Sequence, residues 1–157
     1  LTGKQGDTMK ESVIVSLTCA LEWLKRHNYN IDELFEKELK NGFHVHTPSG
    51  ATPKDGPSAG GAFTIAFISR ILGRPIKNNI SMTGEIELTG KISKIGGLEF
   101  KLMGAKKAGI KMAYVPLENK KDIDDIKKKY KELIDGEFKV VLFDNIDNVI
   151  EKILCTK

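Results

Sequence analysis

The sequence predicts one compact domain of mixed helices and strands, in the α+β (α/β) class. Its 157 residues match the usual length of a single domain. Hydrophobic residues make up 40% of the chain, which is enough at this length to bury a core. Segments with helical periodicity alternate along the chain with short strand-like segments. This alternation favours helices packed on mixed sheets.

The first third of the chain predicts one helix, one strand and one irregular loop. Apolar residues recur at spacings of three and four over residues 6–27, which predicts a helix with Asp7 as its N-cap. Residues 43–47 alternate in polarity and are expected to form a strand. Residues 47–61 contain three prolines and four glycines, so irregular backbone is expected there.

The next helix starts at Ser58 or Ala59 and runs to Leu72, where Gly73 ends it. It is apolar on nearly every face and is therefore expected at the centre of the domain. The remaining predicted elements are a strand at 80–88, a hairpin through Thr89-Gly90 into a strand at 91–95, a helix from Gly96-Gly97 to Gly109, a strand at 112–115, a charged helix at 122–134, a strand at 138–143 and a last helix at 144–154.

Charge and composition exclude several classes of function. The 25 Lys and Arg against 21 Asp and Glu leave a net charge of +4, too small and too evenly mixed for a dedicated nucleic-acid-binding protein. Two cysteines, Cys19 and Cys155, are too few for a disulfide framework, so a reducing compartment is expected. No apolar run approaches the ~20 residues that span a bilayer, and no signal peptide opens the chain. Because the first residue is Leu1, we expect a piece of a longer protein.

The segment Gly50-Ala51-Thr52-Pro53-Lys54-Asp55-Gly56-Pro57-Ser58-Ala59-Gly60-Gly61 is the most suggestive of chemistry. A loop so rich in Gly and Pro places Ser58 at a helix N-terminus, where free N–H groups and the helix dipole can hold an anion or an oxyanion. Ser58 is therefore a candidate nucleophile. Two alternatives stand beside this one. Ser58 could simply cap the helix, or the loop could bind phosphate, although it lacks the Gly-Lys-Ser/Thr ending of a P-loop.

Lys101 is a candidate general base. Leu98, Leu102 and Ala105 define an apolar stripe on the helix that follows Gly97, and Lys101 lies within that stripe. A lysine on a buried face is costly when charged, which would favour the neutral amine that a base requires. The alternative is that the side chain reaches water at the edge of the stripe.

His44 and His46 alternate with Val45 and so face one side of the predicted strand. A pair between Ser58 and His46, with Asp55 as the third member, would make a conventional triad. A metal site would need a third ligand, and nothing nearby has metal-ligand spacing. Packing or hydrogen bonding under the loop is the simpler expectation for the two histidines.

Four motifs together resemble a known family. They are Pro53-Lys54-Asp55-Gly56-Pro57-Ser58-Ala59-Gly60, Thr83-Gly84-Glu85-Ile86, Gly90-Lys91-Ile92 and Ile95-Gly96-Gly97-Leu98-Glu99-Phe100-Lys101. In order and spacing they resemble the nucleophile and catalytic-lysine segments of the Lon proteases. The match extends from Leu1-Thr2-Gly3 to Glu118-Asn119-Lys120 and covers almost the whole chain. Phe100 departs from the family pattern, which usually has a charged residue there.

The resemblance implies a serine endopeptidase with a serine–lysine dyad. Ser58 would attack the peptide carbonyl and form an acyl-enzyme, and Lys101 would take the serine proton. Thr83 matches a position whose hydroxyl helps to orient the lysine. Asp55 and Glu85 match positions near the dyad that help to switch the site between inactive and active shapes. Backbone N–H groups around Ser58 would hold the oxyanion. The competing interpretation is a non-catalytic or phosphate-binding module whose Gly-rich loop caps a helix.

The resemblance also implies how the domain is used. Residues 1–157 would form a Lon proteolytic domain that lacks the strands with which this domain usually starts, and the ATPase domain that precedes it. ATP with Mg would bind in that missing domain, and no cofactor or metal is expected in this one. The implied partners are unfolded or misfolded proteins and the other subunits of a homohexamer, with no membrane and no nucleic acid. The implied setting is the mitochondrial matrix or the bacterial cytoplasm, with a slight preference for the mitochondrion.

Overall fold

A computed structural model describes residues 1–34, 36, 40, 42–48 and 51–156. The elements, in chain order, are α1 (Asp7–Arg26), α2 (Ile31–Leu34), α3 (Gly60–Leu72), β1 (Ile80–Met82), β2 (Glu85–Ile86), β3 (Ile92–Ser93), α4 (Leu98–Lys107), β4 (Met112–Pro116), the 3₁₀ turn η2 (Leu117–Asn119), α5 (Lys120–Lys129), β5 (Lys139–Phe143), the 3₁₀ turn η3 (Ile146–Asn148) and α6 (Ile150–Ile153). Helices and strands therefore alternate through most of the chain, and the predicted fold class is confirmed.

The strands form two small sheets. β1, β4 and β5 make a parallel sheet in the order β1-β4-β5, with Ile80 opposite Met112 and Met112 opposite Lys139. β2 and β3 make an antiparallel pair in which Ile86 lies opposite Ile92. The connection from β1 to β4 contains the β2–β3 hairpin and α4, and the connection from β4 to β5 contains α5. This topology places α4 close to β1, the strand that follows α3.

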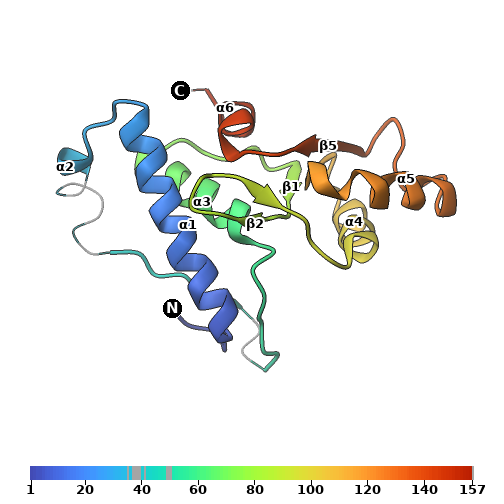
Figure 1. Ribbon diagram of the computed structural model, residues 1–157, viewed down its shortest axis with the longest axis horizontal. Coiled ribbons are helices and arrows are strands. Elements are labelled where there is room, and N and C mark those ends of the chain that lie inside the picture. The colour runs from blue at the N-terminus through green and yellow to red at the C-terminus, as the bar shows by residue number, and fades with distance from the viewer. Residues whose placement is uncertain (35, 37–39, 41, 49–50, 157) are drawn as a thin grey trace.

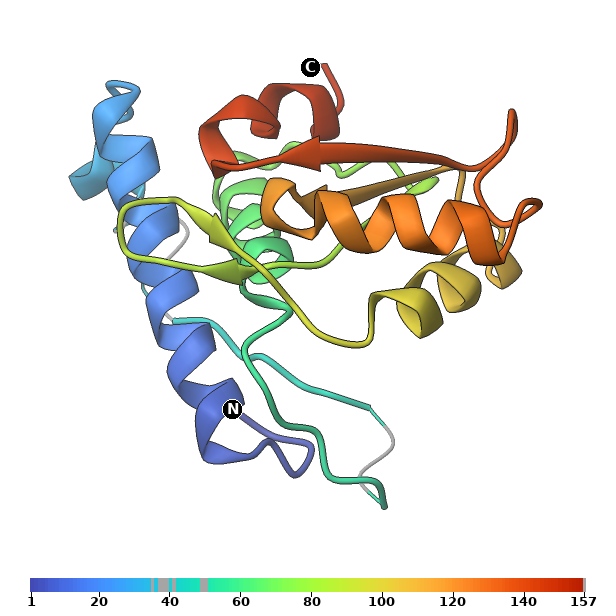
Figure 2. The same ribbon diagram turned by 45° about the vertical axis from the view of Figure 1, so that its right-hand side comes forward.

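Two groups of buried apolar side chains hold the elements together. The first joins α1 to α3 and α6 and includes Trp23, Leu24, Ile68 and Ile150. The second joins α4 and α5 to the parallel sheet and includes Leu98, Leu102, Val115, Ile126 and Phe138. Figure 1 shows α1 and α2 at one end of the molecule and α4 and α5 at the other, with the strands between them. Figure 2 shows the turned end of the β2–β3 hairpin lying across α1. Burying each large apolar side chain contributes about 1.5–3 kcal/mol.

The predicted strand at 80–88 is wrong as a single strand, because the chain changes sheets in its middle. The N–H of Thr83 still donates to Tyr114 O of β4, at 3.1 Å. The N–H of Gly84 instead donates to Ser58 O, at 2.8 Å. From Glu85 onward the chain pairs with β3. The break therefore places residues 83 and 84 beside the serine loop.

Other boundaries also differ from the predictions. Residues 43–47 form no strand: the chain there pairs with the N-terminal segment through one isolated bridge, between Thr2 and His46. The helix predicted at 122–134 runs from Lys120 to Lys129. The helix predicted at 144–154 is two short pieces, η3 and α6, because the backbone at Val149 leaves the helical region (φ −126°).

The predicted cap of the first helix is also wrong. The N-cap of α1 is Gly6, and Asp7 is the first helical residue with a fully exposed side chain. In the part of the chain that the structure describes, no helix is long and apolar enough to cross a membrane.

Candidate active site

Ser58 lies in the turn that leads the glycine-rich loop into α3 and is half-buried. Residues 49 and 50 of that loop lie outside the described residues. The N-cap of α3 is Ala59, and no side chain makes a capping hydrogen bond there. The alternative in which Ser58 caps the helix is therefore wrong, and its hydroxyl is free for another role.

The backbone at Ser58 is held by two donors. Its carbonyl oxygen accepts hydrogen bonds from Thr83 Oγ1 at 3.1 Å and from the N–H of Gly84 at 2.8 Å. In return, the carbonyl of Gly84 accepts from the N–H of Gly61 at 3.1 Å. These three bonds join the start of α3 to the segment between β1 and β2. They fix the direction in which Ser58 presents its hydroxyl.

Lys101 reaches Ser58 from α4. Its Nζ lies 3.0 Å from Ser58 Oγ and donates a hydrogen bond to it, although 43 positions separate the two residues. Lys101 belongs to the first turn and a half of α4, which starts after Gly97 in the left-handed region (φ 65°). Glycine adopts that conformation more readily than any residue with a Cβ. The helix start thus allows the chain to turn sharply and aim Lys101 at the serine.

The expectation that Lys101 is buried is wrong, because the residue is exposed. On the same helix Leu98 and Leu102 are 4% and 2% exposed and pack toward the sheet. Lys101 lies at the edge of this apolar face and extends toward Ser58 rather than into the core. The alternative that placed its amine at the edge, in reach of water, describes the structure better.

A hollow of about 170 Å³ opens beside the two residues. It is lined by Ser58, Ala59, Ser81, Met82, Thr83, Lys101, Leu102, Ala105, Ala113, Tyr114 and Val115. Most of these side chains are apolar or small. The Tyr114 phenol is part of this lining, and burial raises its pKa above its ordinary value. The hollow can therefore take an apolar side chain next to the serine.

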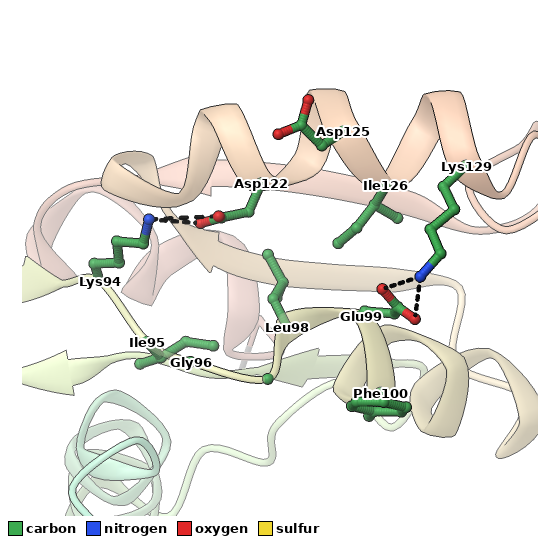
Figure 3. Close-up of a pocket in the computed structure, with 11 residues that line it drawn as sticks. Lys94, Ile95, Gly96, Leu98, Glu99, Phe100, Asp122, Asp125, Ile126 and Lys129 are labelled. Carbon is green, nitrogen blue, oxygen red and sulfur yellow. Dashed lines mark hydrogen bonds and ion pairs between the residues drawn. The ribbon is translucent and has the colours of Figure 1, made fainter.

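A second, wider hollow of about 390 Å³ lies between the start of α4 and α5. Figure 3 shows ion pairs on both sides of it, Lys94 with Asp122 and Lys129 with Glu99. The Tyr130 hydroxyl and, to a smaller extent, Lys129 hold the pKa of Glu99 below its usual range. This hollow contains neither Ser58 nor Lys101 and is therefore not the candidate site.

Two serines on α1 support the site and were not found by sequence reasoning. Ser16 is fully buried, and its one hydroxyl proton is shared between Ser12 O at 2.7 Å and Gly60 O at 3.0 Å. Ser12 donates to Pro57 O at 3.4 Å. Together they satisfy backbone oxygens on either side of Ser58. Their spacing of four placed them on the helix face that also carries Ala20, but that pattern did not reveal their partner.

The other residues suggested by the sequence lie at different places. Thr83 contacts the carbonyl of Ser58 rather than the amine of Lys101. Asp55 accepts hydrogen bonds from the N–H groups of Met9 and Gly56. Glu85 is exposed in β2. The role of Asp55 and Glu85 in switching the site stays a prediction.

The two histidines share one hydroxyl. Thr2 Oγ1 lies 2.8 Å from His44 Nε2 and 2.8 Å from His46 Nδ1. Within the described ranges, His46 makes no hydrogen bond to Ser58 and none to Asp55. The geometry therefore does not assemble the triad that the sequence left open. Among those same residues, no group of three or more His, Cys, Asp and Glu could hold a metal ion.

Comparison with known proteins finds matches over nearly the whole chain. The model of the Lon protease (S16) C-terminal proteolytic domain matches residues 1–156. The chain is 51% identical over 150 residues (96% of the chain) to the Lon protease homolog of Acanthamoeba polyphaga mimivirus. It is 46% identical over 140 residues (88% of the chain) to the Lon protease of Desulfosudis oleivorans. It is 44% identical over 126 residues (80% of the chain) to the human Lon protease homolog, mitochondrial.

These relatives are much longer than this chain, which spans 14%, 16% and 13% of their respective lengths. One of them is bacterial and one is named mitochondrial. These two relatives leave the choice between a bacterial and a mitochondrial setting open.

Proposed function

The chain belongs to the Lon protease (S16) family, and we propose that it cleaves peptide bonds with Ser58 as nucleophile and Lys101 as general base. The observation that carries this proposal is the 3.0 Å contact between Lys101 Nζ and Ser58 Oγ. It brings the two residues within the distance over which a base takes a proton.

In the proposed reaction the neutral amine of Lys101 takes the proton of Ser58 as Oγ attacks the peptide carbonyl. The carbon–nitrogen bond then breaks, and the lysine ammonium gives that proton to the departing amine. An acyl-enzyme on Ser58 remains. Water attacks this ester with Lys101 again as base, which releases the carboxylic acid and restores the serine.

Backbone N–H groups at the start of α3 are proposed to stabilise the oxyanion. The N–H of Gly60 already donates to Pro57 O and that of Gly61 to Gly84 O. The N–H groups of Ser58 and Ala59 are therefore the better candidates. They lie next to the attacking oxygen, and the N-terminal dipole of the thirteen-residue α3 acts in the same direction.

The apolar hollow beside Ser58 is proposed to receive the substrate side chain at the bond that is cut. Its volume of about 170 Å³ suits one apolar side chain. A substrate that places one side chain in this hollow must extend its backbone across the half-buried Ser58. Unfolded or misfolded proteins meet this requirement, and folded domains do not.

Further parts of the proposal concern the whole protein. Since the relatives are about six to seven times as long as this chain, we place the domain in a larger protein, and the family resemblance implies a homohexamer. ATP with Mg would bind to a domain outside this chain and drive the unfolding of substrates. The setting is a mitochondrial matrix or a bacterial cytoplasm. Added ATP is therefore expected to leave the reactivity of Ser58 in the isolated chain unchanged.

A fluorophosphonate probe tests the dyad directly. It reacts with an activated serine by forming an oxygen–phosphorus bond and releasing fluoride, and mass spectrometry locates the label. Wild type should be labelled on Ser58, while Ser58→Ala and Lys101→Ala should not be labelled. Cleavage of an unstructured fluorogenic peptide should be lost in the same two variants.

His46→Ala is the matched control for the alternative base. Under the proposal this variant keeps its labelling and cleavage, whereas a triad would lose both. Labelling that persists in Lys101→Ala, with the fold intact, would remove Lys101 from the mechanism.

A further inference from the structure

Asn119 is a fully buried amide that connects two parts of the structure near the candidate site. It ends η2, between β4 and α5. Its Oδ1 accepts a hydrogen bond from the N–H of Ile95 at 3.1 Å, and its Nδ2 donates to Ile95 O at 2.9 Å. The second proton of Nδ2 goes to Asp122 Oδ2 at 2.7 Å. The side chain thus holds both backbone polar groups of one residue, 24 positions earlier in the chain.

Ile95, the residue that Asn119 holds, lies just before α4, the helix that carries Lys101. Ile95 is followed by Gly96 and Gly97, and α4 begins directly after them. The N–H of Lys101 donates to Gly97 O at 3.3 Å. Figure 3 shows this stretch passing below α5 and turning into α4. The position of Ile95 therefore sets where α4 begins.

No side-chain packing fixes the two glycines themselves. A Cβ built on Gly96 or Gly97 would meet no atom within 4 Å. Glycine also has the widest backbone freedom of any residue. The direction of α4 at this end thus depends on the hydrogen bonds that hold Ile95, together with the packing of the buried Leu98 and Leu102 on the sheet.

Asp122 fixes the orientation of the Asn119 amide. Its carboxylate lies 3.0 Å from Lys94 Nζ, on one side of the hollow in Figure 3. Lys94, and after it the Asn119 amide, hold the pKa of Asp122 below its usual range. The ionised carboxylate can only accept hydrogen bonds, so Nδ2 of Asn119 must face it. This leaves Oδ1 toward the N–H of Ile95.

We propose that Asn119 is a positioning residue for the dyad: by holding Ile95 it sets the direction from which α4 presents Lys101 to Ser58. The inference rests on the proposed peptidase function. Asn119 does not line the hollow beside Ser58, so it acts on the geometry of the dyad and not on substrate binding.

The test compares Asn119→Ala and Asn119→Asp with Glu118→Gln. The aspartate keeps an acceptor for the N–H of Ile95 but loses the donor to Ile95 O and repels Asp122. Glu118 is the matched control because it precedes Asn119 in η2 and accepts from the N–H of Lys94 at 3.0 Å, at the exposed surface. The rate of fluorophosphonate labelling on Ser58 is measured per folded chain, with the folded fraction taken from circular dichroism and thermal unfolding.

Both Asn119 variants should lose on the order of 10²-fold in labelling rate, because a misplacement of about 1 Å costs that much. Their kcat on the fluorogenic peptide should fall in parallel while KM stays unchanged, and Glu118→Gln should keep the wild-type rates. A purely structural role would lower the folded fraction but leave the rate per folded chain intact. That result, or failure of both variants to fold, would overturn the inference.

Failure of the proposed function gives a different pattern. In that case wild type is not labelled on Ser58, or Lys101→Ala is labelled as fast as wild type. If instead wild type reacts and Lys101→Ala does not, unchanged rates in folded Asn119 variants contradict only the positioning role.

Discussion

The carboxylate of Asp55 accepts a hydrogen bond from the N–H of Met9 at 2.9 Å, across 46 positions of sequence. The same oxygen accepts from the N–H of Gly56 at 2.8 Å. Gly6, at the start of α1, lies so close that a Cβ there would fall 2.3 Å from the Asp55 carboxyl carbon. A residue of the serine loop thus caps a helix that comes much earlier in the chain, and this contact joins the loop to α1.

Loss of this cap should destabilise the fold. Asp55→Ala is expected to lower the free energy of unfolding by about 1 kcal/mol, the usual effect of removing an N-terminal cap. Urea unfolding measures the change. Asp7→Ala is the control, because the fully exposed Asp7 side chain pairs with Lys10 at the surface and surface changes of this kind stay within about 0.5 kcal/mol. Equal losses in both variants would contradict the capping role of Asp55.

Thr83→Val should affect both stability and reactivity. It removes the hydroxyl that donates to Ser58 O at 3.1 Å, which costs about 1 kcal/mol in unfolding free energy. The labelling rate of Ser58 should also fall, since the backbone that carries the nucleophile loses one of its two donors. In the control, Thr18→Val removes a similar bond to Ile14 O on the exposed face of α1. Labelling that is equally slow in Thr18→Val would show that the effect is not local.

Alanine substitutions at Gly60 and at Gly104 should change the stability of the fold in opposite directions. A Cβ on Gly60 would lie 2.7 Å from Ile86 Cγ2 and 3.0 Å from Ile86 N, and such overpacking costs about 1–3 kcal/mol. A Cβ on Gly104, inside α4, would meet nothing within 4 Å, so alanine there should stabilise the helix by about 0.5–1 kcal/mol. Thermal unfolding of Gly60→Ala and Gly104→Ala gives the two signs. A stabilised Gly60→Ala would contradict the close packing of α3 on β2.

The contribution of Asp135 to stability should depend on pH. Hydrogen bonding from Lys106 Nζ, and after it from the N–H groups of Phe138 and Glu137, lowers the pKa of Asp135 to about 2. Because the folded-state value lies below the unfolded one of 3.8, the ionised carboxylate stabilises the fold above that pH. The contribution is lost as the pH falls toward about 2.

Urea midpoints of wild type and Asp135→Asn should therefore differ by a constant amount at neutral and weakly acidic pH, and the difference should shrink below the unfolded-state pKa. Asp125→Asn is the control, since the ion pair of Asp125 with Lys128 is long, at 3.7 Å, and lies at the surface. Its midpoint should follow that of wild type throughout. If the urea midpoints of wild type and Asp135→Asn differ by the same amount at every pH, the stabilising role of the ionised carboxylate is contradicted.

Periodicity in the sequence was sufficient for the larger elements. The helical spacing in residues 6–27 and the apolar run up to Leu72 correspond to α1 and α3. Short elements were harder to predict from the sequence, because tertiary hydrogen bonds decide where they begin and end. The chain from residue 80 to 88 was predicted as one strand, yet the N–H of Gly84 donates to Ser58 O and the strand breaks there.

The sequence alone determined the fold class, the family resemblance and the two residues proposed for the dyad. Those conclusions depend on residue types in a fixed order, which the chain carries without folding. The tertiary structure decided that Lys101 is exposed and reaches Ser58. It also decided that Asp55 caps α1 and that Asn119 holds Ile95. These contacts join residues 24 to 46 positions apart. No local pattern encodes them, because side chains so distant in sequence meet only when the helices and sheets have packed together.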